Sequence, residues 1–457
     1  MADKAVSLRG EQTVLFTNRQ LVALMWPLLL EQFLAITVGL ADSLMVATVG
    51  DAAISAVSLV DSISNLMIYI FSAMATGGAA VAGQYIGQRQ KEDACHAGQQ
   101  LIALLAVVSV FFVALLYLFR AQVLTVMFGH IEPDVMAATN TYYLYVMASI
   151  PGIALYNGGA ALWRTMGRSD ISLKVSLLMN GINVAGNAIL IFGFGMDVAG
   201  VAIPTLVSRT VAAAVILGML FNDKLTLHLS NVRAFRLDMR LMKNIFYIGV
   251  PSGVENGMFH LGRLVLFSLI STFGTAAMVA NAIGNTIANF NCFSGSAINL
   301  GLAAVVSQCV GAGEFDQARA YMKKIVKWTY GIMAVVNLGI MALLPFIMRV
   351  YNVSPEAEKL AVTVSLVHGI SSIFLWIPAF TIPSFLRAAG DAQFTMLASM
   401  TTMWLVRVLL AYVLGRYLGY GVVGVWFAHA ILDWLVRGAV FILRYRSGKW
   451  ESMGIKT

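Results

Sequence analysis

The sequence predicts an all-α, polytopic membrane protein with twelve transmembrane helices arranged as two six-helix lobes. Three observations predict this fold class. Of the 457 residues, 59% are hydrophobic and only 11% carry a charge, which is typical of a membrane protein and not of a soluble domain. Apolar stretches long enough to cross a bilayer recur along the whole chain. The second half of the chain also repeats the first, as a tandem duplication does.

The repeat relates residues that lie 224 positions apart in the chain. The recurring pairs are Pro27 and Pro251, Glu31 and Glu255, Gly50 and Gly274, Gln84 and Gln308, Gly87 and Gly311, and Gly200 and Gly424. Each repeat contains six predicted spans, and an even number brings both repeats into the membrane with the same orientation. We therefore expect the lobes to be related by a pseudo-two-fold axis along the membrane normal.

Hydropathy places the twelve spans along the chain. They are 21–47, 54–86, 99–119, 135–156, 171–193, 199–221, 244–272, 277–310, 325–348, 361–385, 393–415 and 422–443. These bounds define an N-terminal lobe over 1–221, a polar linker over 222–243 and a C-terminal lobe over 244–457. The N-terminus has no signal-peptide core, so we expect the first span to remain in the mature protein. Pro378 and Pro383 predict a kink in the tenth span.

Lysine and arginine are distributed unevenly over the predicted loops. With both termini inside, the inner segments contain 22 of the 30 basic residues, the outer loops contain four, and the remaining four lie within spans. Basic residues favour the cytoplasmic side of a membrane. We therefore expect a multi-pass protein of the plasma (inner) membrane with both termini and the linker 222–243 in the cytoplasm.

Composition and motifs argue against several other classes of function. The formal net charge is +8, but the basic residues lie at the ends of spans, so we expect no nucleic-acid partner. The three cysteines have neither metal-ligand nor redox spacing. The chain contains no P-loop, no G-x-S-x-G nucleophile motif and no metal-ligand pair. We therefore expect no enzyme, no cofactor and an energy source other than ATP.

The first span contains two carboxylates, Glu31 and Asp42, which lie eleven residues apart. Eleven residues make about three helical turns, so both acids lie on nearly one face, roughly 16 Å apart along the axis. A charge in hydrocarbon costs at least about 2.5–3.5 kcal/mol, which predicts a protein-lined or watery cavity. Asp42 is either a charge at the outer interface or an ion or proton site. We favour the second, because acids within the membrane are functional by default.

Polar side chains also share one face of the fifth span and one face of the sixth. Asn180, Asn183 and Asn187 follow the spacing i, i+3 and i+7, and Thr205 and Arg209 follow i and i+4. Hydrogen-bonding residues of this kind often join helices within a membrane. Together with Asp42, their oxygens also suit a hard cation or a hydrogen-bonded acid. Both interpretations stay open at this point.

A second polar group lies in the last two spans. His429, Asp433 and Arg437 are spaced four residues apart on the twelfth span, and Arg407 lies on the eleventh. Opposite charges within a bundle can neutralise one another as a structural ion pair, and we favour this over a functional role.

At these residues the chain resembles the multidrug and toxic compound extrusion (MATE) family of transporters. The matching motifs are Pro27-x-x-x-Glu31, Asp42-x-x-Met45-Val46-x-x-x-Gly50, Gln84-x-x-Gly87, Gln308-x-x-Gly311, Arg164-x-x-Gly167, Arg387-x-x-Gly390, and Leu190-Ile191-Phe192-Gly193 with the later Gly200. The likeness covers essentially the whole chain. It implies two lobes around a central cleft that opens alternately to either side, and export of amphipathic, often cationic compounds driven by inward flow of H⁺ or Na⁺. We expect such a transporter to work in the lipid bilayer as a monomer.

The resemblance also implies an ion-coupling site within the N-terminal lobe. Asp42, Asn183 and Thr205 take three of the family's four positions there, and Asn187 stands where an aspartate is common. This departure leaves Asp42 as the only expected carboxylate, which can still balance one Na⁺ or one proton. The C-terminal lobe lacks a matching acid, because Leu266 is the repeat partner of Asp42.

Glu31 and Glu255 are the expected substrate ligands. Each follows a proline by four residues in the first helix of its lobe, and the resemblance places these helices beside the central cleft. One carboxylate on each wall would suit a lipophilic cation. The alternative is that each glutamate satisfies backbone groups freed by its proline.

Two further classes of function stay open. A lipid-linked saccharide flippase could share this architecture, but its cleft should be more basic in order to hold a pyrophosphate. The other class is a non-transporting receptor or scaffold, for which the very short loops leave little surface for partners.

Overall fold

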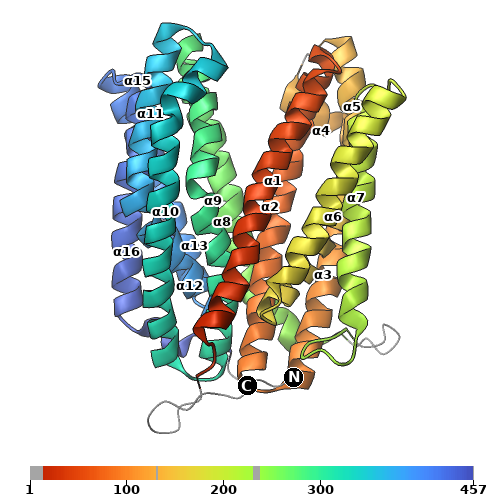
Figure 1. Cartoon of the computed structure of the whole chain (residues 1–457), viewed down its shortest axis with the longest axis vertical. Coiled ribbons are helices and arrows are strands. Elements are labelled where there is room, and N and C mark those ends of the chain that lie inside the picture. Colours follow the sequence, from red (N-terminus) through yellow and green to blue (C-terminus); the bar gives the residue numbers. More distant parts are fainter. Residues whose placement is uncertain (1–13, 130–131, 230–236, 456–457) are drawn as a thin grey trace. The chain divides into compact units, whose positions relative to one another are not determined.

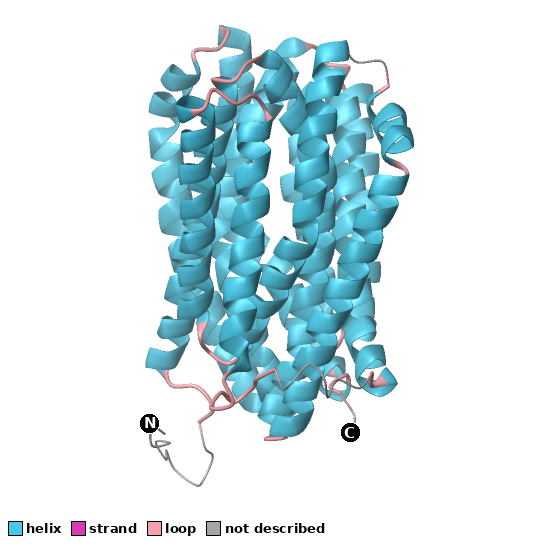
Figure 2. Ribbon diagram, turned by 90° about the vertical axis from the view of Figure 1, so that its right-hand side faces the viewer, coloured by secondary structure: helices cyan, strands magenta, loops and turns pink. Residues whose placement is uncertain are grey.

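The structure is a computed structural model that describes residues 14–129, 132–229 and 237–455. These residues form helices joined by short loops, and no strand occurs among them (Figure 2). The helices group into twelve long stretches over this described part of the chain, and each coincides with one predicted span (Figure 1). The predicted all-α, polytopic fold class is therefore confirmed.

The first repeat contains seven α-helices and two short helical turns. They are α1 (Asn18–Ala47), α2 (Asp51–Gly87), α3 (Lys91–Leu118), α4 (Arg120–Phe128), α5 (Pro133–Thr165), α6 (Ser169–Ala188), η1 (Ile189–Gly193), α7 (Ala199–Gly218) and η2 (Met219–Phe221). α8 begins at Met239, inside the predicted linker 222–243. Arg233 and Arg236 of the linker lie outside the described residues.

The second repeat has more interruptions, several of them π-helical. Its helices are α8 (Met239–Ser271), α9 (Thr275–Gly311), α10 (Phe315–Tyr351), α11 (Pro355–Phe374), η4 (Ile377–Thr381), α12 (Ile382–Ala388), α13 (Ala392–Thr402), η5 (Met403–Val408), α14 (Leu409–Tyr412), η6 (Val413–Tyr417), α15 (Gly421–Phe427), η7 (Ala428–Asp433), α16 (Trp434–Arg446) and η8 (Lys449–Ser452). The tenth span bends by 66° between α11 and the η4–α12 segment. Pro378 lies in this segment, so the predicted kink is present.

Nine of the described helices are long and apolar enough to cross a membrane, and the bent pair raises this number to ten. The other two predicted spans correspond to α5 and α8, which have 33 residues each. Both contain many polar side chains, such as Asn140 in α5 and His260 in α8. Length and hydropathy together therefore support a multi-pass membrane protein.

Residue chemistry explains where several of these helices begin. Pro133 and Pro355 occupy the first positions of α5 and α11, where a missing N–H costs nothing. The turns before α2 and α9 contain Gly50 and Gly274, which have φ angles of +133° and +95°. Glycine adopts positive φ without a side-chain clash, so the same turn forms at the same place in both repeats.

Packing divides the chain into two compact units. Unit 1 comprises Met1–Gln32, Gly87–Arg89 and Val254–Thr457, and unit 2 comprises Phe33–Ile86 and Gln90–Gly253. The division falls inside α1 and inside α8, so each of these helices contributes to both units. The lobe boundaries expected at 221 and 243 stay a prediction.

Unit 2 is built on close contacts between α5 and its neighbours α3, α6 and α7. A Cβ atom at Gly152 would lie 3.1 Å from the backbone of Arg209 on α7. One at Gly186 of α6 would lie 2.7 Å from Pro204. Small residues let helix backbones approach closely in a membrane, and this packing holds α6 and α7 beside each other.

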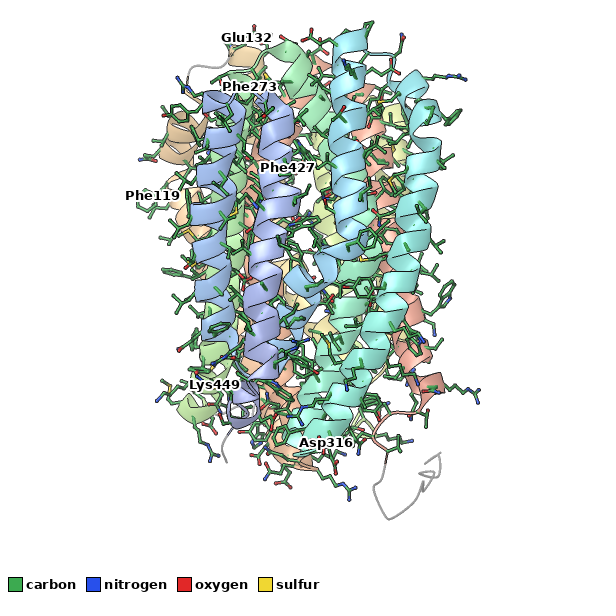
Figure 3. The ribbon with its side chains drawn as sticks, turned by 90° about the vertical axis from the view of Figure 1, so that its left-hand side faces the viewer. Phe119, Glu132, Phe273, Asp316, Phe427 and Lys449 are labelled. Atoms are coloured by element: carbon green, nitrogen blue, oxygen red, sulfur yellow. The ribbon has the colours of Figure 1, made fainter. Side chains whose placement is uncertain are left out.

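Unit 1 has its core between α9 and the helices α10, α11 and α12. Figure 3 shows Asp316 and Lys449 at one end of this unit and Phe273 towards the other. Large apolar side chains cover much of its outside, and Phe427 is 40% exposed.

Candidate ion-coupling site

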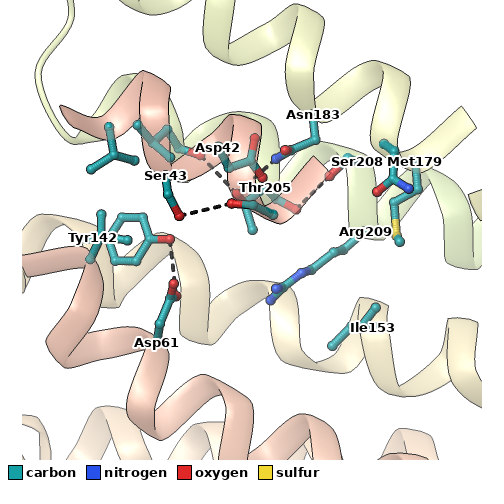
Figure 4. Close-up of a pocket in the computed structure, with 15 residues that line it drawn as sticks. Asp42, Ser43, Asp61, Tyr142, Ile153, Met179, Asn183, Thr205, Ser208 and Arg209 are labelled. Carbon is teal, nitrogen blue, oxygen red and sulfur yellow. Dashed lines mark hydrogen bonds between the residues drawn. The ribbon is translucent and has the colours of Figure 1, made fainter. Parts of the chain in front are cut away.

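A cavity of about 240 Å³ lies inside unit 2. Helices α1, α2, α5, α6 and α7 surround it (Figure 4). Its lining residues are Gly39, Asp42, Ser43, Val46, Val57, Asp61, Tyr142, Ile153, Met179, Asn180, Asn183, Val201, Thr205, Ser208 and Arg209. Most of the polar side chains that the sequence singles out in the first, fifth and sixth spans therefore line one cavity.

Asp42 is held at this cavity by the two asparagines of α6. Asn187 donates its amide N–H to Oδ1 of Asp42 across 3.0 Å. Asn183 and Asn187 lie one helical turn apart on α6, with 8% and 0% of their surface exposed. The helical spacing noted in the sequence therefore directs both amides towards the same carboxylate.

The neighbours of Asn183 select one of its two amide orientations. With its nitrogen towards Asp42, Asn183 donates to both carboxylate oxygens across 2.9 and 3.0 Å. Its oxygen then accepts a hydrogen bond from Thr205 Oγ1 across 3.1 Å. The opposite orientation would point an amide oxygen at a carboxylate, which is unfavourable. Asp42, Asn183, Asn187 and Thr205 thus form one hydrogen-bonded group, and their role in ion coupling stays a prediction.

A second carboxylate lines the same cavity, and the sequence-based expectation that Asp42 is the only one there is wrong. Asp61 on α2 accepts a hydrogen bond from the hydroxyl group of Tyr142 on α5, across 3.3 Å. Figure 4 shows this pair facing each other at the edge of the cavity. The sequence does carry a signal for Asp61, because an acid inside an apolar span is itself unusual. It carries none for Tyr142, because only the packing of α2 against α5 brings the two together.

Arg209 supplies the one positive charge among the residues that line this cavity. Its guanidinium donates to Ser149 Oγ across 2.8 Å, and Figure 4 shows it extended between the helices. With Asp42 and Asp61 ionised, the lining carries two negative charges and one positive charge, a net charge of −1. One monovalent cation would make this site neutral.

Glu255 has a different environment in unit 1. Its carboxylate pairs with Arg387 on α12 at 3.1 Å and with Arg437 on α16 at 3.0 Å, and only 3% of the residue is exposed. Two guanidinium groups therefore already balance its charge. Glu31, its repeat partner, is likewise buried, with 6% exposed. Whether either residue contacts a substrate stays a prediction.

The polar group in the last two spans forms a buried ion pair. Arg407 of η5 contacts Asp433 of η7 through Nε at 3.0 Å and through Nη2 at 2.5 Å. Both side chains are almost completely buried. Arg437 lies over the ring of Phe259 at 4.6 Å and also pairs with Glu255. Arg407 and Asp433 thus form an ion pair, whereas Arg437 pairs outside the expected group, with Glu255. That these pairs have only a structural role stays a prediction.

Long apolar helices that surround a charged and hydrogen-bonded cavity define the class of protein: a multi-pass membrane protein with a polar site among its spans. A family model described as MatE matches residues 27–189 and 251–413. The two matches fall one in each repeat and together cover more than half of the chain. The chain therefore belongs to the MatE family, the multidrug and toxic compound extrusion transporters that its motifs resemble.

Relatives and a solved structure agree with this assignment. YisQ of Bacillus subtilis (strain 168), described as an uncharacterised transporter, is 29% identical over 449 residues and covers 95% of each chain. NorM of Thermotoga maritima, described as a probable multidrug resistance protein, is 23% identical and covers 96% of this chain and 94% of its own. A solved structure described as an outward-facing multidrug resistance MATE family transporter has a TM-score of 0.85 at 19% identity, covering 96% of this chain and 97% of that one. At 19% identity, the likeness to this solved structure shows that the two chains share a fold and nothing further.

Proposed function

We propose that this protein is a secondary active transporter that exports amphipathic small molecules by alternating access, in exchange for inward flow of H⁺ or Na⁺. Family membership supports transport, and the names of relatives such as NorM support multidrug substrates. The observation that carries the ion-coupling part is the cavity in unit 2, where two amides converge on Asp42.

Charge explains how such a cavity could couple to an ion. A carboxylate inside a membrane protein is costly unless hydrogen bonds or a cation offset its charge. Asn183 and Asn187 supply hydrogen bonds, and Arg209 offsets one of the two carboxylates that line the cavity. One negative charge is then left for a transported cation. A cation that binds one conformation better than another shifts the equilibrium between them.

Asp42, Asn183, Asn187 and Thr205 are our proposed ion-coupling residues. Either coupling ion fits this arrangement: a proton needs only a carboxylate oxygen, whereas Na⁺ would also draw on the oxygens of Thr205 and the asparagine amides. We further propose that both termini lie in the cytoplasm, that the membrane is the plasma membrane, and that the protein works as a monomer.

Glu31 and Glu255 are our proposed substrate residues. The two arginines that pair with Glu255 leave it little capacity to bind a cationic substrate. Glu31 is also buried, on the helix α1 that carries Asp42, and we keep it as a proposed substrate residue.

Proteoliposomes provide the test of this function. Vesicles that contain the purified protein are given a pH gradient or, separately, a Na⁺ gradient, and the movement of a fluorescent lipophilic compound is followed. We expect at least one gradient to drive accumulation of the compound, with protein-free vesicles as the control. Equal movement with and without either gradient would contradict secondary active transport.

A further inference from the structure

The residues around the unit 2 cavity have repeat partners in unit 1, at an offset of 224 positions. Gly39, Asp42, Asp61, Asn183, Thr205 and Arg209 correspond in this order to Arg263, Leu266, Asn285, Arg407, His429 and Asp433. All six partners lie within Val254–Thr457 of unit 1. A duplicated fold therefore places a second set of polar side chains at the position equivalent to the cavity.

The two sets carry opposite charge. In unit 2, Asp42, Asp61 and Arg209 sum to −1. At the equivalent positions of unit 1 both acids are replaced by uncharged residues, Leu266 and Asn285. Two arginines and one aspartate now occupy the other positions, and these sum to +1. The duplicated site has thus changed from one that attracts cations to one that attracts anions.

One of these charges, that of Arg263, is not part of the ion pairs found within the described residues of unit 1. Asp433 is bound by Arg407, and Glu255 is bound by Arg387 and Arg437. Arg263 makes no ion pair with any residue that the structure describes. It is exposed, and its neighbour in this group, His429, is only partly buried. Both side chains are therefore accessible to a molecule outside the protein.

Contacts within unit 1 join Arg407 to Phe259 and His429 to His368. The guanidinium of Arg407 lies over the ring of Phe259 at 5.2 Å, and Phe259 precedes Arg263 by one turn of α8. The rings of His429 and His368 have centroids 6.0 Å apart, and both lie within electrostatic range of Arg263.

The position of Arg263 on its helix also argues that it faces away from lipid. A guanidinium in hydrocarbon is costly, and Arg263 lies in the seventh span. Its repeat partner Gly39 lines the unit 2 cavity. An equivalent orientation in unit 1 would turn Arg263 away from lipid, towards the partly buried His429.

We propose that unit 1 contains an anion-binding site formed by Arg263 and His429, at the position equivalent to the ion-coupling cavity of unit 2. A singly charged group fits its net charge of +1. The ligand is either a small inorganic anion such as chloride or the carboxylate or sulfonate group of an amphipathic substrate. Only the second of these sources rests on the proposed transport function.

Tryptophans next to the site supply a direct probe of binding. Trp426 and Trp434 have ring centroids 5.8 Å and 5.5 Å from that of His429, and both are buried, with 3% and 2% exposed. Iodide quenches tryptophan fluorescence on close approach. Iodide in the site should therefore add a saturable component to the linear quenching that exposed residues such as Trp26 give.

The experiment titrates purified wild-type protein and the variant Arg263→Gln with sodium iodide at constant ionic strength, with gluconate as the balancing anion. We expect the variant to lose the saturable component or to bind iodide at least about tenfold more weakly, because a charge-assisted partner is removed. Arg263→Lys keeps the charge and should keep most of the binding. Arg349→Gln, which removes another exposed arginine of unit 1, should behave as the wild type.

Competition identifies the source of the anion. Chloride and an alkyl carboxylate are each added at fixed iodide. Displacement by chloride alone indicates an inorganic anion, and displacement by the alkyl carboxylate indicates a substrate group. Purely linear quenching of the wild type, the same curve for Arg263→Gln, or no displacement by either competitor would overturn the proposal. None of these readouts requires transport, so failure here is distinct from failure of gradient-driven export.

Discussion

Asn187 donates an amide N–H to Asp42 across 3.0 Å and thereby joins α6 to α1 inside unit 2. The bond lies at a cavity that also contains Asp61 and Arg209. Its acceptor therefore belongs to a group of charged side chains that line one cavity. We therefore expect ion binding to change the net charge of this group.

The charge balance between Asp61 and Arg209 can be tested by paired substitutions. Asp61→Asn changes the net charge of the cavity from −1 to 0, and Arg209→Gln changes it to −2. We expect each variant to lose most gradient-driven export. The double variant returns the charge to −1 and should recover a substantial part of it, in proteoliposomes with equal amounts of protein.

Hydrogen bonding supplies the control for this pair. Tyr142→Phe removes the donor to Asp61 without changing any charge, so it should impair export less than Asp61→Asn. Losses in the double variant that equal the sum of the two single losses would show that net charge is not what the cavity requires.

The buried pair of Arg407 and Asp433 should contribute strongly to stability. Asp433→Asn leaves the Arg407 charge without its partner, and we expect it to lower the free energy of unfolding by about 3–5 kcal/mol. Asp170→Asn breaks the exposed pair with Arg168 and should cost less than about 1 kcal/mol. Detergent-based chemical unfolding of both variants measures the difference. Similar losses for the two would mean that burial does not control the strength of these pairs.

Much of this fold follows from local patterns in the sequence. Helical spans need only apolar length, and the face shared by Asn183 and Asn187 follows from 3.6 residues per turn. The repeat offset of 224 positions predicts that Gly50 and Gly274 form equivalent turns, and both have positive φ. These features require no knowledge of which helices pack together.

Contacts between distant spans could not be predicted in the same way. Tyr142 and Asp61 lie 81 residues apart, and Glu255 lies 132 residues from Arg387. Neither pair has a spacing that marks it in one sequence, because the contact depends on how whole helices rotate and pack. The choice of amide orientation at Asn183 likewise depends on Asp42, which lies on another helix.

Substitutions that remove charge can show whether Glu31 and Glu255 bind substrate or only stabilise the structure. The double variant Glu31→Gln with Glu255→Gln should reduce export of cationic dyes more than export of matched neutral dyes if both carboxylates bind substrate. Pairing of Glu255 with two arginines leads us to expect that Glu255→Gln alone affects both dye classes alike and lowers stability. An efflux panel normalised to protein in the membrane decides. If the variant Glu255→Gln lost export of cationic dyes but kept export of neutral dyes, the structural role would be contradicted.

The orientation of the chain can be tested with impermeant thiol reagents. In a background without Cys95, Cys292 and Cys309, we expect Arg236→Cys in the linker to resist labelling in intact cells and to react after lysis. Glu356→Cys, at the exposed start of α11, belongs to a predicted outer loop and should react from outside. Ready labelling of Arg236→Cys in intact cells would reverse the assigned topology.

The central claim is that the charge of Asp42 is what the coupling ion neutralises. Asp42→Asn keeps the size and most hydrogen-bonding capacity of the side chain but makes it permanently neutral, so it should fold and still bind substrate. The most direct measurement compares two activities of this variant in proteoliposomes: accumulation of dye under the driving ion gradient, and exchange of dye without any gradient. We predict that accumulation is lost while exchange continues. Accumulation at the wild-type rate in Asp42→Asn would contradict the account.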